Sequence, residues 1–285
     1  MRTQRLVGYF WLLLSGSVAI AGGNCQTGAG GRPYVFEAIP LLSASRSHDL
    51  LAPLTRELAT RSGLCLELRV PASVADFDAH FRAGMPDFAV ANPQQLLISR
   101  RGAEAYVPLL RDAKARLVGL LVVRKDGPYN SLKDLQKSDI GVPSTTAFAA
   151  ALLLRDLLNR AGIDHRLVEL GTPASVLRGV LLGRVAAGGV VTGTLEAEPP
   201  DVTAGLRVML QLPEQPSPML AVHPRVGDAA RQALVNAVVE LSAEPAWRAR
   251  LANVWLAEPV PADYGRDYQH LERLQLQLQP LPAVR

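Results

Sequence analysis

The chain has 285 residues, of which 48% are hydrophobic and 20% charged, so it is long and apolar enough to bury one large core or two smaller ones. Its formal net charge is only +4, and no cluster of Lys and Arg with interleaved aromatic residues occurs. These features argue against a nucleic-acid-binding protein, and we expect no nucleic-acid partner.

The first 21 residues have the features of a secretory signal peptide. Arg2 and Arg5 precede an apolar run over 6–20, and the small residues Ala19 and Ala21 mark a cleavage site after Ala21. A membrane anchor is the weaker interpretation, because the run is shorter than the roughly 20 apolar residues that cross a bilayer and contains Ser and Gly. We expect export to the periplasm, with a Gly-rich leader over 22–32.

The two cysteines, Cys25 and Cys65, allow two arrangements. In an exported protein they can form one disulfide, which would tie the leader to the first folded unit. Alternatively, Cys25 carries a lipid anchor and Cys65 is a buried thiol. A lipoprotein requires a small residue before the acylated cysteine, and Asn24 stands there, so we rank the lipid-anchored form second to a soluble periplasmic one.

Apolar strands and amphipathic helices alternate after the leader. The pattern predicts strands at 34–41, 64–70, 88–91, 116–124, 140–142, 166–170, 186–191, 206–212 and 219–223. It predicts helices at 47–61, 76–82, 94–101, 131–135, 146–161, 174–182, 228–241 and 246–254. This alternation, with buried strands, indicates an α/β fold with mostly parallel sheets and helices on both faces.

Two of the predicted strands end at a polar turn with proline, and an α/β unit lies between them. The simplest arrangement is a discontinuous first lobe, 33–123 plus 219–285, that encloses a second lobe, 124–218. Two connecting strands then form a hinge.

Six motifs in the same order resemble the substrate-binding proteins of phosphonate, phosphite and phosphate ABC importers. They are FRAGMPDFAVANP at 81–93, VVRKD at 122–126, SLKDL at 131–135, GVPSTT at 141–146, AGID at 161–164, and a tail with PVPADY at 259–264 and YQHL at 268–271. The resemblance covers nearly all of the mature chain. It implies a two-lobed type II periplasmic-binding-protein fold that captures a small oxyanion and delivers it to a membrane transporter complex.

The turn Ser144-Thr145-Thr146 is the first candidate for the ligand site, because it follows a strand and begins a helix. Backbone N–H groups and the positive end of the helix dipole favour an anion there, and hydroxyls add donors. Ser144 could instead be a plain helix cap. The resemblance favours binding, since it implies an oxyanion-binding turn at this place.

Other polar residues also follow predicted strands, where α/β folds bind ligands. Asn92, Gln94 and Gln95 begin the helix at the facing edge of the first lobe, although a solvated helix start would explain them equally well. The weaker candidates are Thr172, Thr192 and Thr194.

The sequence departs from the family where the resemblance implies tyrosines, a histidine and an acidic residue. The corresponding residues are Val74 and either Val90 or Leu96, Pro173 or Ala174, and Val191 or Thr192. A phosphonate would lose charge-assisted hydrogen bonds in so apolar a cleft. The ligand is then the family's oxyanion, another anion, an amide-bearing metabolite or a largely apolar compound.

No constellation of an enzyme is present in the sequence. It has no Gly-x-Ser-x-Gly elbow or Gly-rich phosphate loop, and its five histidines (His48, His80, His165, His223, His270) lack neighbours at metal-ligand spacing. We expect a monomer without catalysis, cofactor or metal. The alternative is a sensory or interaction module of the same fold. Such receptors usually continue into a transmembrane helix, and no apolar run precedes Arg285.

Overall fold

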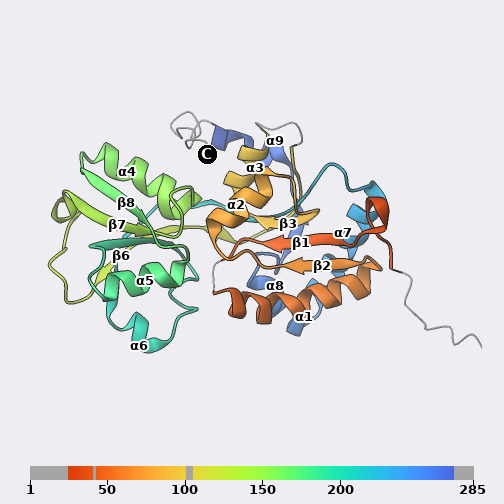
Figure 1. Cartoon of the computed structure of the whole chain (residues 1–285), viewed down its shortest axis with the longest axis horizontal. Helices are drawn as coiled ribbons and strands as arrows, with labels where there is room; N and C mark the ends of the chain where they lie inside the picture. The colour runs from red at the N-terminus through yellow and green to blue at the C-terminus, as the bar shows by residue number, and fades with distance from the viewer. Residues whose placement is uncertain (1–24, 41–42, 101–104, 273–285) are drawn as a thin grey trace, which may run out of the picture.

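The structure is a computed structural model that describes residues 25–40, 43–100 and 105–272. The predicted signal peptide lies outside these residues. Figure 1 shows two lobes side by side, each built around its own sheet with helices packed on it. The predicted two-lobed α/β fold is therefore confirmed.

The first lobe contains a six-stranded sheet with the order β13-β4-β12-β3-β1-β2. Its strands are β1 (Tyr34–Ala38), β2 (Leu66–Arg69), β3 (Phe88–Ala91), β4 (Val107–Asp112), β12 (Met219–Val222) and β13 (Pro259–Pro261). Its longer helices are α1 (Ala44–Ser62), α2 (Val74–Arg82), α3 (Pro93–Ser99), α7 (Asp228–Ala243) and α8 (Pro245–Ala252), and its shorter ones η1 (Ala29–Gly31), α9 (Tyr264–Asp267) and η4 (Gln269–Leu271).

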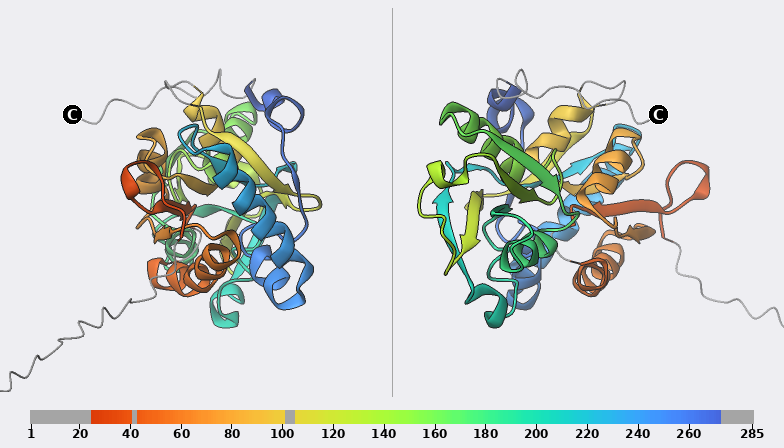
Figure 2. Two further views of the ribbon diagram at one scale, coloured as in Figure 1. Left: turned by 90° about the vertical axis from the view of Figure 1, so that its right-hand side faces the viewer. Right: turned by 60° about the vertical axis from the view of Figure 1, so that its left-hand side comes forward.

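Helices cover both faces of this sheet. Apolar side chains of α1, α7 and α8 pack on one face, and those of α2 and α3 pack on the other. The C-terminal helices, blue in Figure 2, contact the N-terminal α1, which is orange. The first lobe is thus assembled from both ends of the chain.

The second lobe contains a five-stranded sheet with the order β10-β6-β9-β7-β8. Its strands are β6 (Gly119–Arg124), β7 (Ser138–Val142), β8 (His165–Glu169), β9 (Ala187–Val191) and β10 (Leu206–Gln211). Its helices are η2 (Leu132–Leu135), the π-helical η3 (Phe148–Leu153), α4 (Leu154–Arg160), α5 (Pro173–Leu181) and α6 (Pro200–Thr203). The core side chains of α4 and α5 belong to separate clusters, on opposite sides of the sheet.

Both sheets are mixed, which differs from the mostly parallel sheets that the sequence predicts. In the first lobe only the pairs of β1 with β2 and β3 are parallel, and in the second only those of β7 with β8 and β9. The strands that follow the two passages between the lobes, β6 and β12, pair antiparallel to their neighbours. These strands are buried on both faces, so their sequences are continuous apolar runs, which are typical of parallel strands.

A separate two-stranded sheet of β5 (Arg116–Leu117) and β11 (Gln215–Pro216) connects the lobes. The strand predicted at 116–124 is therefore two strands, which divide at Val118. β6 pairs with β9 and β10 and so belongs to the sheet of the second lobe. The sequence analysis instead ended the first part of the first lobe at residue 123, which placed most of β6 in the first lobe. The break was hidden because the apolar run continues through the buried residues Leu117 and Val118.

Two glycines let the second lobe's helices lie directly on its sheet. A Cβ at Gly189 would lie 1.9 Å from the carbonyl oxygen of Ala150, in η3, and a Cβ at Gly119 would lie 2.6 Å from that of Ala149. Only glycine permits this approach. The approach positions the segment that leads from the turn at 144–146 into the helix.

The leader is attached to the first lobe by a disulfide between Cys25 and Cys65, whose Cα atoms are 5.1 Å apart. Beside it, the backbone N–H of Gln26 donates to the carbonyl oxygen of Gly63 at 2.7 Å. The covalent link thus closes a loop that contains β1 and α1.

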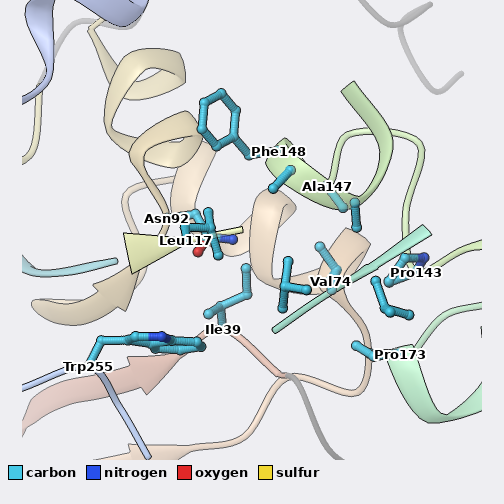
Figure 3. A pocket seen from close by; sticks show the side chains of 13 residues that line it. Ile39, Val74, Asn92, Leu117, Pro143, Ala147, Phe148, Pro173 and Trp255 are labelled. Carbon is cyan, nitrogen blue, oxygen red and sulfur yellow. The ribbon is translucent and has the colours of Figure 1, made fainter. Parts of the chain in front are cut away.

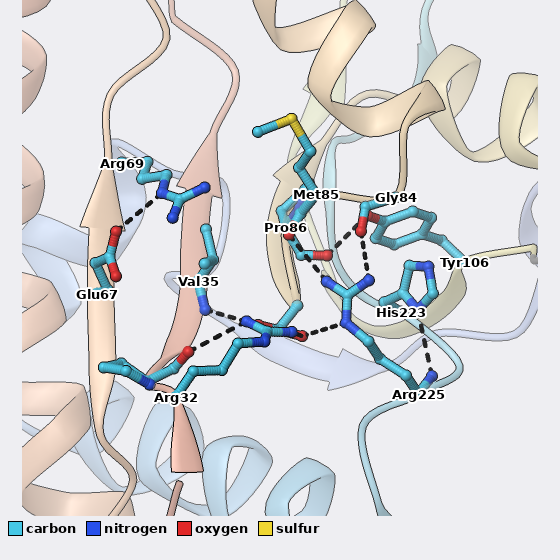
Figure 4. Close-up of polar contacts among 12 residues, drawn as sticks. Arg32, Val35, Glu67, Arg69, Gly84, Met85, Pro86, Tyr106, His223 and Arg225 are labelled. Atoms are coloured by element: carbon cyan, nitrogen blue, oxygen red, sulfur yellow. Dashed lines mark hydrogen bonds and ion pairs between the residues drawn. The ribbon is translucent and has the colours of Figure 1, made fainter. Parts of the chain in front are cut away.

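Asp87, before β3, joins three segments of the first lobe. Its buried carboxylate accepts hydrogen bonds from Arg32 at 2.7 and 2.9 Å, from the Val35 N–H at 2.8 Å and from Arg225 at 2.6 Å. Figure 4 shows both guanidinium groups converging on this place. Burial alone would raise the pKa of Asp87, but these hydrogen bonds outweigh it and hold the pKa below its usual range.

Within the described part of the chain, no helix is long and apolar enough to cross a membrane. The same residues contain no group of three or more His, Cys, Asp and Glu side chains that could hold a metal ion.

Candidate functional site

A small pocket lies between the two lobes, where the parallel strands end (Figure 3). Ile39, Val74 and Asn92 line it from the first lobe, and Pro143, Pro173 and Val191 line it from the second. Its free volume is about 20 Å³, enough for about one water molecule. The structure is therefore a closed state in which the lobes meet with no room for an organic ligand.

The pocket is apolar. Among its lining residues only Asn92 carries an amide, and none carries a hydroxyl or a charge. Trp255 forms one wall with its ring and has a φ of 53°, which is rare for a bulky residue. The surrounding fold must stabilise this conformation, and it places an aromatic surface in the pocket.

Three positions where the sequence departs from the family pattern face this pocket: Val74, Pro173 and Val191. The cleft is accordingly less polar than the resemblance implies. Val90 and Leu96 are fully buried in the core of the first lobe and do not line the pocket.

The turn at 144–146 lies beside the pocket, and its hydrogen-bond donors have partners within the protein. The N–H of Thr145 donates to the Glu169 carboxylate at 3.1 Å, and that of Thr146 to the Ser144 hydroxyl at 3.3 Å. The N–H of Ala147 donates to the carbonyl oxygen of Ser144 at 3.0 Å. In the closed state the turn therefore offers no vacant backbone donor over 145–147.

A carboxylate from the opposite lobe also reaches this turn. The Thr146 hydroxyl donates a short hydrogen bond to Asp78 of α2, and the side-chain amide of Gln95 donates to the other Asp78 oxygen at 2.6 Å. The Gln95 side-chain oxygen accepts from the Asn92 N–H at 3.0 Å, so the network extends to the pocket. Burial raises the pKa of Asp78, while the bonds from Thr146 and Gln95 act against this rise.

Asp78 is the site residue that the sequence reasoning missed. The buried residues of α2 are Val74, Phe77, Asp78 and Phe81, at the spacing of one helix face. A carboxylate at a position of this apolar stripe was the signal, because an acidic side chain is buried only where partners compensate it.

The other sequence candidates lie close to the site but take different roles. Asn92 lines the pocket, and its buried amide oxygen faces the Gln95 backbone N–H in the capping box of α3 without a hydrogen bond of normal geometry to the described residues. Gln94 is buried without lining the pocket. Thr172 caps α5 by accepting from the Ser175 N–H at 3.2 Å, and the Thr192 backbone N–H donates to Val118 beside the hinge at 3.0 Å.

A second polar contact joins the lobes at the start of α1. The Arg46 side chain donates to the carbonyl oxygen of Ala197 at 3.1 Å and lies 3.8 Å from the buried Glu198 carboxylate. Arg178 of α5 lies 3.7 Å from the same carboxylate. Glu198 thus bridges an arginine of each lobe.

Solved structures with a similar fold include binding proteins of phosphonate transporters. PhnD1 from Prochlorococcus marinus in complex with methylphosphonate aligns with a TM-score of 0.76 and 17% identity, over 87% of this chain and 98% of that one. A binding protein component of an ABC phosphonate transporter from Pseudomonas aeruginosa aligns with a TM-score of 0.74 and 16% identity, over 86% of each chain. A Xanthomonas citri protein bound to chloride ion aligns with a TM-score of 0.69 and 18% identity, over 86% of this chain and 98% of that one.

At these identities the solved structures show the fold alone, and no curated protein matches the sequence. The family model for the periplasmic substrate-binding protein of phosphonate ABC transporters matches residues 36–268, which is most of the chain. The chain therefore belongs to this family of proteins, which capture a ligand and deliver it to an ABC transporter.

Proposed function

We propose that this chain supplies its ABC importer with a small, mostly apolar ligand that carries no strong negative charge, bound between the two lobes. The observation that carries the proposal is the lining of the interlobe pocket, in which Asn92 is the only side chain with an amide, a hydroxyl or a charge among the described residues. Ligand sites obtain affinity from apolar walls and orientation from a few polar groups.

Asn92 defines the polar part of such a ligand. Its buried amide oxygen faces the Gln95 backbone N–H in the capping box of α3 but makes no hydrogen bond of normal geometry with the described residues, so it can still accept one. A ligand with one N–H or O–H donor would satisfy this oxygen, while its apolar body contacts Val74, Pro173 and Trp255.

Ligand access requires the lobes to separate, because the closed pocket is too small for an organic molecule. The two short strands β5 and β11 are the passages between the lobes, and such connections absorb the motion in hinged proteins. With a ligand bound, the lobes would close onto its apolar body rather than onto each other, because the pocket without a ligand holds only about one water molecule.

A phosphonate-like oxyanion is the second candidate. The family match favours it, and so does the position of the turn at 144–146 at the beginning of a helical segment. Two observations argue against an oxyanion. No charged donor lines the pocket among the described residues, and Glu169 and Asp78 already accept hydrogen bonds from the turn.

The disulfide supports the soluble form of the exported protein. A lipid anchor at Cys25 needs the sulfur that is bonded to Cys65. We therefore infer that the mature protein, after signal-peptide cleavage behind Ala21, is soluble in the periplasm rather than lipid-anchored, and that it is a monomer stays a prediction.

A thermal-shift screen of residues 22–285 tests the ligand class, since a ligand that binds only the folded state raises its melting temperature. The panel contains methylphosphonate and phosphate on one side and small neutral amides and alcohols with apolar bodies on the other. We expect a shift with a neutral compound that Asn92→Leu removes and that Asn253→Leu retains, since Asn253 is an exposed residue that follows α8. A shift with methylphosphonate alone would establish the second candidate instead.

A further inference from the structure

The carboxylate of Asp78 lies against the turn at 144–146, which is the first candidate for an anion site in the sequence. It projects from α2 of the first lobe, is 2% exposed, and accepts the hydroxyl hydrogen bond of Thr146 in the second lobe. Its other oxygen is held by Gln95 at 2.6 Å, and Gln95 is itself attached to the Asn92 backbone at 3.0 Å. The position of the charge is therefore set by packing and by two hydrogen bonds.

Both side-chain donors to Asp78 are neutral, one hydroxyl and one amide. Neutral donors compensate a buried carboxylate only partly. A second anion at the same turn would add like-charge repulsion at contact distance. At an effective dielectric constant of about 20, two unit charges about 4 Å apart repel by an energy that corresponds to a factor on the order of 10³ in affinity.

We propose that Asp78 is a specificity-determining residue that acts as an internal anion on this turn and excludes phosphonate and phosphate from the cleft. This proposal rests on the proposed function, in which the ligand carries no strong negative charge. It names the one side chain that would exclude a charged ligand. Exclusion by an unfavourable charge is an established route to ligand discrimination in proteins.

Glu169 is a second carboxylate at the turn, and it is expected to matter less. It accepts from the Thr145 N–H at 3.1 Å, but it is exposed at the end of β8. Water screens an exposed charge far more than a buried one. Glu169→Gln therefore serves as a measure of how much charge removal alone contributes at the same turn.

The test is the binding of methylphosphonate and of phosphate by isothermal titration calorimetry to the mature protein and its variants. Asp78→Asn removes the charge and keeps one side-chain oxygen, which can accept from Gln95, while its NH2 group faces the Thr146 hydroxyl, which can accept from it. Asp76→Asn is the matched control, because Asp76 lies on the same helix, is hydrogen-bonded only to Ser73 in the described structure, and also carries one negative charge. Asp78→Ser provides a second variant if the asparagine variant does not fold.

We expect Asp78→Asn or Asp78→Ser to bind methylphosphonate at least roughly a hundredfold more tightly than the unmodified protein and Asp76→Asn, with a smaller gain in Glu169→Gln. Adding Thr146→Val to Asp78→Asn should remove the gain, which places the anion on the turn. Equal affinity in the folded Asp78 variants and the unmodified protein would overturn the proposal, and so would tight methylphosphonate binding by the unmodified protein. The thermal-shift screen with neutral compounds tests the ligand class separately. A gain in methylphosphonate affinity in Asp78→Asn would therefore support the role of Asp78 even if no neutral compound binds.

Discussion

Removing the Cys25–Cys65 disulfide should destabilise the protein by an amount that the loop length determines. The two cysteines are 40 residues apart, and the cross-link restricts the unfolded chain to conformations in which the loop is closed. The chain-entropy relation for a loop of this length gives about 4 kcal/mol at 25 °C. With a urea m-value of about 3 kcal/mol/M, the unfolding midpoint should fall by about 1.3 M.

The assay is urea unfolding of the mature protein and of the double variant Cys25→Ser/Cys65→Ser, followed by circular dichroism. Reductant should move the midpoint of the unmodified protein to that of the variant and leave the variant unchanged. The m-value should rise in the variant, because the unfolded chain without the cross-link exposes more surface. An unchanged midpoint in both the variant and the reduced protein would refute the loop-closure reasoning.

Asp87→Ala should lower the free energy of unfolding by about 3 kcal/mol, because it leaves two arginines and a backbone N–H without their shared acceptor. Since the pKa of Asp87 is lowered on folding, its contribution to stability is present above the pKa of the unfolded state, about 4, and is lost as the pH falls through the pKa of the folded state. Urea unfolding at several pH values should show the difference from the unmodified protein shrinking in acid, and a constant difference would contradict the assignment. Gly189→Ala should destabilise by about 1 to 3 kcal/mol or more, since the added Cβ would lie 1.9 Å from the Ala150 carbonyl oxygen. Its control in thermal unfolding is Gly227→Ala, where a Cβ meets no atom within 4 Å, and equal melting temperatures of the two variants would count against the close packing of η3 on β9.

Local patterns were sufficient to predict most of the elements and the overall architecture. The helix predicted at 47–61 lies within α1, and the strand predicted at 88–91 coincides with β3. Such patterns are readable because a helix or strand repeats its buried positions at a fixed spacing along the chain. The order of the predicted elements, with two strands that each end at a polar turn with proline, was enough to infer two lobes with a hinge, and the family resemblance implied the same fold.

Pairing over long distances was not readable from local patterns. β4 was not predicted, although its burial alternates in the way of a strand with one covered face, and β13 is only three residues long. The partners of β4 are β12 and β13, which lie more than a hundred residues further along the chain. The division of one apolar run into β5 and β6 likewise depends on which sheet each half joins.

The sequence by itself determined the candidates for the site, and only the tertiary structure decided which of them meet. Ser144, Thr146, Asn92 and Gln95 follow strands or begin helices, which is a local property, and their strand ends come together when the lobes close. Asp78 is 68 residues from Thr146, and nothing in the neighbourhood of either residue indicates their contact. The charge that faces a ligand depends on this contact, because burial and hydrogen bonding across the lobes, rather than residue type alone, determine the electrostatics of the cleft.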